Sequence, residues 1–125
     1  MGMTPLKFLI AGLGFVVIFL TGFVLRRTGQ PFPAGILTVH KLVTVATIAF
    51  LAKIVLGMTK LAPLGQVEWI ACIAAGAFFL LAIASGGWLS AVREMPAMVR
   101  VLHLILPFLT ALSTAAFLYL MFRRR

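Results

Sequence analysis

The chain has 125 residues, of which 63% are apolar and only 10% are charged, and its mean hydropathy is +1.19. Soluble domains carry about a quarter charged residues, so this composition excludes a soluble globular protein and predicts an integral membrane protein. The net charge of +9 does not indicate binding to nucleic acid, because the basic residues stand at the ends of apolar runs rather than among aromatic residues on a polar face.

Four apolar runs follow one another along the chain, at residues 6–25, 34–57, 69–92 and 97–122. A helix of about 20 apolar residues crosses the bilayer, so we predict helices over about 5–26, 34–58, 67–92 and 97–122, within a single membrane domain that covers residues 1–125. A signal peptide is the alternative for the first run. Arg26 and Arg27 follow it and no small-residue cleavage site stands out, so we expect this run to be retained.

Short segments rich in proline, glycine and polar residues separate the runs: TGQPFP, KLAPLGQ and REMP. Short connections make neighbouring helices antiparallel, so the predicted fold class is an all-α, integral membrane, four-helix up-down-up-down bundle. Trp69 and Trp88 bracket the third run with a rise of about 28 Å between them, which places one indole at each membrane interface.

The two halves of the chain resemble each other. A shift of 63 residues gives ten identities in 62 pairs, more than composition alone predicts, and the shift aligns FPAGILTVH with MPAMVRVLH. The only two histidines, His40 and His103, coincide without a gap. This repeat predicts two duplicated helical hairpins within the bundle.

His40 and His103 are the candidate metal ligands. The second and fourth helices of such a bundle run the same way, so both histidines lie about 10 Å below the same membrane surface. Ionisable groups at that depth are costly in hydrocarbon and usually mark a site. Zinc needs three or four protein donors, whereas haem needs only two axial ligands, so the pair predicts one haem b.

Four further residues are candidate contacts of this haem. Thr44 stands one helical turn after His40, and Arg100 shares a helical face with His103. Lys41 and Arg93 lie toward the same surface, and we expect Arg100, Lys41 and Arg93 to pair with haem propionates. Snorkelling to lipid headgroups explains each cation equally well, and helix packing explains Thr44.

Small residues are frequent on the first and third helices, and Gly22 and Gly86 are among them. Small residues either let membrane helices approach closely or leave room for a flat ring. The sequence leaves both readings open.

Two histidines from two helices of a four-helix membrane bundle resemble the small membrane cytochromes b, especially the cytochrome b561-like group. Those proteins commonly hold two haems with two histidine pairs, whereas this chain has one pair. The resemblance implies single-electron transfer with a quinone, a small reductant or a partner redox protein. An enzymatic activity would then be of the oxidoreductase type.

Two other functions are open. The chain could be a cofactor-free accessory or assembly subunit of a larger membrane complex, with both histidines merely hydrogen-bonded to neighbouring helices. A small multidrug-type transporter has a similar size, but it needs a carboxylate within the membrane. Here Glu68 and Glu94 stand at opposite ends of the third run.

Charge also bears on orientation. Lys7, Lys60 and the arginines at positions 123–125 flank one side, against Arg26, Arg27 and Arg93 on the other. We therefore expect both termini in the cytoplasm, in a bacterial or archaeal cytoplasmic membrane.

Overall fold

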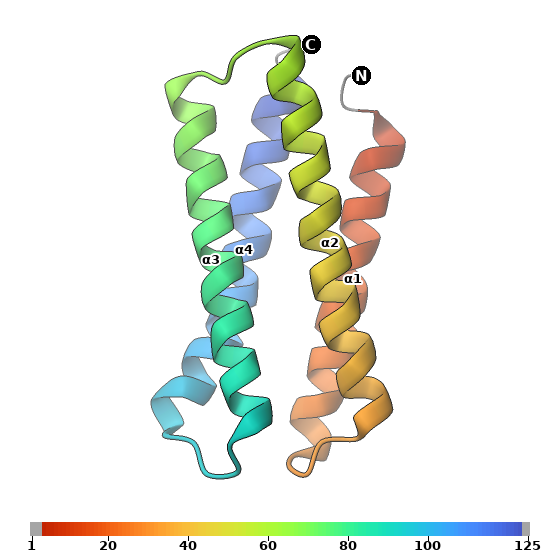
Figure 1. Ribbon diagram of the computed structural model, residues 1–125, viewed down its shortest axis with the longest axis vertical. Helices are drawn as coiled ribbons and strands as arrows, with labels where there is room; N and C mark the ends of the chain where they lie inside the picture. Colours follow the sequence, from red (N-terminus) through yellow and green to blue (C-terminus); the bar gives the residue numbers. More distant parts are fainter. Residues whose placement is uncertain (1–3, 124–125) are drawn as a thin grey trace. The chain divides into compact units, whose positions relative to one another are not determined.

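The structure is a computed structural model that describes residues 4–123. Four helices make up this range, namely α1 (Pro5–Thr28), α2 (Ala34–Leu61), α3 (Gln66–Ala91) and α4 (Ala97–Arg123) (Figure 1). Each of them is long and apolar enough to cross a membrane. The all-α fold class and the assignment as an integral membrane protein are therefore confirmed.

The helix ends follow local chain chemistry. Pro5 opens α1 behind Thr4, whose hydroxyl accepts a hydrogen bond from the Lys7 N–H at 3.4 Å. Gly29 closes α1 with a φ of 67°, a backbone conformation that glycine adopts without strain. The helix α2 runs to Leu61, three residues past the predicted end, because no breaker precedes Pro63.

The chain divides into two compact units, the first ending at Leu61 and the second beginning at Ala62. The first unit is a hairpin of α1 and α2, and the second is a hairpin of α3 and α4; within each, the two helices run antiparallel side by side (Figure 1). We call them the first hairpin and the second hairpin and describe each by itself. They are the two hairpins that the sequence repeat predicted, whereas the single membrane domain stays a prediction.

The repeat extends to the pattern of burial. Buried residues of α2 are Thr47, Leu51 and Ile54, and the residues 63 positions later, Thr110, Thr114 and Phe117, are buried in α4. These positions continue the helical face that begins at His40 in α2 and at His103 in α4. Each histidine therefore lies on the least exposed face of its helix, on the N-terminal side of these buried residues.

Candidate functional site

His40 is held within the first hairpin by a hydroxyl group of the neighbouring helix. It is the seventh residue of α2, and its side chain is half-buried. Its Nδ1 atom lies 2.8 Å from Oγ1 of Thr21 on α1. The imidazole is therefore fixed across the hairpin, about 9 Å from the start of α2.

His103 is held in the same way within the second hairpin. It is the seventh residue of α4, and its Nδ1 atom lies 2.8 Å from Oγ of Ser85 on α3. Ser85 is buried, with 7% of its surface exposed. Both hairpins thus contain a histidine on the second helix and a hydroxyl partner on the first.

The hydroxyl partners are also engaged by their own helices. The Thr21 hydroxyl lies 2.7 Å from the Val17 carbonyl oxygen, and the Ser85 hydroxyl lies 3.1 Å from the Ala82 carbonyl oxygen. A hydroxyl that donates its single proton to such a carbonyl can only accept at the histidine, which then carries its proton on Nδ1. In that tautomer the lone pair is on Nε2, the arrangement in which histidine binds a metal ion.

A glycine next to each hydroxyl partner admits the imidazole ring. A Cβ atom at Gly86 would lie 2.7 Å from Cε1 of His103, and one at Gly22 would lie 3.2 Å from Cε1 of His40. The first distance is one that real side chains essentially never show, and the second is tight. In both hairpins the small residue thus serves the close approach of a histidine ring from the neighbouring helix, which was not among the uses considered from the sequence.

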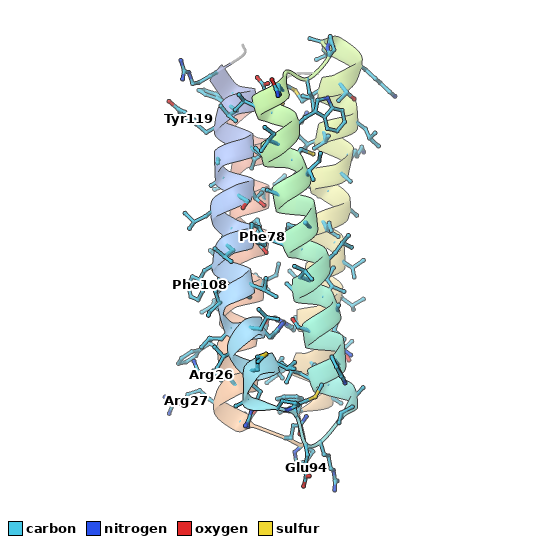
Figure 2. The ribbon with its side chains drawn as sticks, turned by 90° about the vertical axis from the view of Figure 1, so that its left-hand side faces the viewer. Arg26, Arg27, Phe78, Glu94, Phe108 and Tyr119 are labelled. Carbon is cyan, nitrogen blue, oxygen red and sulfur yellow. The ribbon has the colours of Figure 1, made fainter. Side chains whose placement is uncertain are left out.

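The other candidate residues lie around the histidines in different ways. The Thr44 hydroxyl donates to the His40 carbonyl oxygen at 2.7 Å, so it is engaged by its own helix. Lys41 and Arg100 are exposed on α2 and α4, and Arg93 is exposed in the α3–α4 loop. Glu94 projects from that same loop (Figure 2). The contact of Lys41, Arg93, Arg100 and Thr44 with a haem stays a prediction.

His40 and His103 belong to different hairpins, and each makes its side-chain hydrogen bond to the other helix of its own hairpin. Within residues 4–123 no group of three or more His, Cys, Asp or Glu side chains could hold a metal ion. What the structure establishes is two equivalent histidine clusters, Thr21–Gly22–His40 and Ser85–Gly86–His103.

Sequence reasoning missed Thr21 and Ser85. The uniform shift of 63 residues pairs Thr21 with Ala84, whereas Thr21 and Ser85 are 64 residues apart in the chain. The hydroxyl partner precedes the histidine by 19 residues in the first hairpin and by 18 in the second. The two loops are equally long, and the extra residue lies in the last turns of α1 after Thr21. Allowing this one-residue difference aligns both Thr21 with Ser85 and Gly22 with Gly86, and this is the signal that would have found them.

Comparison with known protein families, curated proteins and solved structures finds no match for this chain.

Proposed function

We propose that this chain is a b-type haem-binding membrane protein that carries single electrons, in which Nε2 of His40 and Nε2 of His103 would hold one haem. The observation that carries the proposal is the pair of Nδ1 hydrogen bonds to Thr21 and Ser85. Metal-binding histidines are usually oriented by such a bond from the nitrogen that does not bind the metal. A porphyrin needs only two protein ligands, and this chain has two histidines so prepared.

Membrane topology supports the proposal independently. In a chain whose four helices all cross the bilayer, the α1–α2 and α3–α4 loops emerge on the same side. Each histidine is the seventh residue of the helix that follows its loop. Both imidazoles would then lie at one depth, about 9 Å from the same surface, as a shared ligand requires.

When bound, a haem with two histidine ligands supplies one-electron transfer rather than oxygen binding. The part of Thr21 and Ser85 is to hold the rings by accepting from Nδ1–H. Arg100, Lys41 and Arg93 carry positive charge toward the same surface, where propionates would lie. Because one haem near one surface does not span the bilayer, the electron partner is a quinone or a redox protein at that surface, and membership of a larger complex is compatible with this.

One rival function has an observation in its favour. The hydrogen bonds from His40 and His103 also join the two helices of each hairpin. A cofactor-free accessory subunit could use the histidines for that purpose alone.

An absorption spectrum separates the two functions. The full chain, purified in detergent and supplied with haemin, is expected to show a Soret band and, after dithionite, the sharp α band of a six-coordinate haem. His40→Ala and His103→Ala should each abolish or strongly perturb these bands, because one axial ligand is lost. Leu42→Ala and Leu102→Ala, at exposed neighbouring positions, serve as controls and should leave the spectrum unchanged. A wild-type chain that binds no haemin would refute the proposal and favour the accessory subunit.

A further inference from the structure

The first hairpin carries positive charge without any carboxylate to neutralise it. Both acidic residues of the chain belong to the second hairpin, Glu68 in the first turn of α3 and Glu94 in the α3–α4 loop. The cations of the first hairpin are Lys7, Arg26, Arg27, Lys41, Lys53 and Lys60. Any anion that pairs with them has to come from outside this hairpin.

Lys53 is the cation in the least favourable position. It precedes Lys60, in the last turn of α2, by seven residues, which places it about 10 Å deeper along the helix. Helical side chains lean toward the N-terminus, so the Lys53 side chain leans away from the nearer membrane surface. Lys41, near the start of the same helix, leans toward its nearer surface.

Lys53 also has no partner within the chain as described. Its side chain is exposed, and it makes no ion pair or hydrogen bond with residues 4–123. A lysine at such a depth costs several kcal/mol unless it reaches water or meets an anion, for which the bilayer can thin locally. A negatively charged group that lies deeper than the ordinary headgroup level would therefore stabilise Lys53 at this depth.

Gly57 has no side chain to fill the space between Lys53 and the nearer membrane surface. Lys53, Gly57 and Lys60 lie on one face of α2 at successive helical turns. A Cβ atom at Gly57 would meet nothing within 4 Å. We call these three residues the Lys53 face: two cations one above the other, with an empty position between them.

We propose that the Lys53 face binds the phosphate of an anionic phospholipid headgroup. Lys53 would turn its side chain back over Gly57 toward the surface and be the deep contact, and Lys60 would be the shallow one. The phosphate would then lie over Gly57 and the acyl chains along apolar residues such as Leu56, which is 63% exposed. Charge complementarity favours this occupant, because a headgroup phosphate is the anion that the bilayer offers beside the end of a transmembrane helix. The proposal does not depend on haem binding.

Lipid selectivity tests the proposal. The full chain is reconstituted in phosphatidylcholine vesicles, and its association with spin-labelled phosphatidylglycerol is measured relative to spin-labelled phosphatidylcholine by electron paramagnetic resonance. Lys53→Gln is expected to lower the preference for phosphatidylglycerol about fivefold, the effect of one lysine near an anionic surface. Gly57→Leu, which fills the open position, should lower it as well, whereas Lys53→Arg should retain it.

Gly12→Leu is the matched control, because Gly12 is also a helical glycine whose Cβ atom would meet nothing within 4 Å. It should leave the preference unchanged. Helix content and gel-filtration volume establish that each variant is folded, and Lys60→Gln gives a second loss of charge on the Lys53 face should Lys53→Gln fail this check. Unchanged preference in the folded charge and Gly57 variants would overturn the proposal. Displacement of phosphatidylglycerol from the wild type by millimolar inorganic phosphate would also overturn it, in favour of a free-anion site.

Discussion

The hydroxyl groups of Thr21 and Ser85 hold the imidazole rings of His40 and His103 by hydrogen bonds to Nδ1. Thr21 and Ser85 each lie 2.8 Å from a histidine Nδ1 atom, and each also donates to a carbonyl oxygen of its own helix. Because a hydroxyl has only one proton, a hydroxyl that donates to its own helix is an acceptor for the histidine tautomer with Nδ1–H, and this tautomer has its lone pair on Nε2. Hydrogen bonds between membrane helices contribute about 0.6 kcal/mol on average, so orientation of the ring is a larger consequence than stability.

We predict that Thr21→Val and Ser85→Ala weaken haem binding about 10- to 100-fold, because the imidazole loses the hydroxyl group that orients it. Titration of the apoprotein with haemin measures the affinity, and a redox titration reports the midpoint potential, which a purely structural role would not move. Thr38→Val and Ser90→Ala are matched controls, since both hydroxyls are exposed and bond only to carbonyl oxygens of their own helices. Unchanged affinity and potential in Thr21→Val and Ser85→Ala would contradict the assigned role.

In each hairpin, particular glycines face a polar side chain of the neighbouring helix and leave no free space for a Cβ atom. In the first hairpin, a Cβ atom at Gly14 would lie 2.5 Å from Oγ1 of Thr47, two helical turns from the contact between Gly22 and His40. In the second hairpin, Gly86 faces His103, while its neighbour Gly87 has nothing within 4 Å of a Cβ position. Helix approach is thus set by particular glycines and not by the general abundance of small residues.

The adjacent glycines Gly86 and Gly87 test whether the packing of α3 against α4 depends on a particular glycine. Gly86→Ala is expected to destabilise the protein by about 1–3 kcal/mol, because the new methyl group overlaps the His103 ring. Gly87→Ala should be neutral or stabilise by up to about 1 kcal/mol through helix propensity. Denaturation in mixed detergent micelles, followed by circular dichroism, measures both.

A double-mutant cycle identifies the cause. Combining Gly86→Ala with His103→Ala should recover part of the lost stability, because the clashing ring is gone. Strict additivity of the two changes would show that the Gly86→Ala effect arises elsewhere. Gly22→Ala, whose Cβ distance to His40 is 3.2 Å, should be milder than Gly86→Ala.

The number of membrane crossings decides whether the two histidines can lie near the same membrane surface. If all four candidate spans cross the bilayer, the α1–α2 and α3–α4 loops emerge on one side and the α2–α3 connection on the other. Arg26 and Arg27 extend outward near the α1–α2 loop (Figure 2). Basic residues occur near both ends of the spans, and labelling distinguishes the two orientations.

Labelling with a membrane-impermeant maleimide checks this topology. In a Cys72→Ala background, single cysteines at Gln30 and Glu94 should react from the same side of sealed vesicles, and a cysteine at Ala62 only from the other side. Membrane permeabilisation should make all three positions equally reactive. Reaction of positions 30 and 94 from opposite sides would place the two histidines near opposite surfaces and exclude a haem shared between them.

Much of the architecture could be predicted because it depends on local properties. The helix starts at Pro5, Ala34 and Ala97 coincide with the predicted ones, since proline, glycine and the length of an apolar run act within a few residues. The helices α1 and α2 end two and three residues later than predicted, at Thr28 and Leu61. A helix continues until a residue that ends it, and here Gly29 and Pro63 follow these ends. His40 and His103 were singled out from sequence as ionisable residues within apolar runs, and their role as metal ligands stays a prediction.

The four apolar helices and the equivalent positions of two histidines in a repeat were predictable from the residue order alone, because hydrophobicity, segment length and residue spacing belong to the chain. The contacts of those histidines with Thr21 and Ser85, and the room that Gly22 and Gly86 leave for them, became visible in the folded hairpins. These contacts join residues 18 and 19 positions apart across a loop. The loop geometry and the rotation of each helix about its axis select which side chains meet, and neither quantity is a property of a single helix.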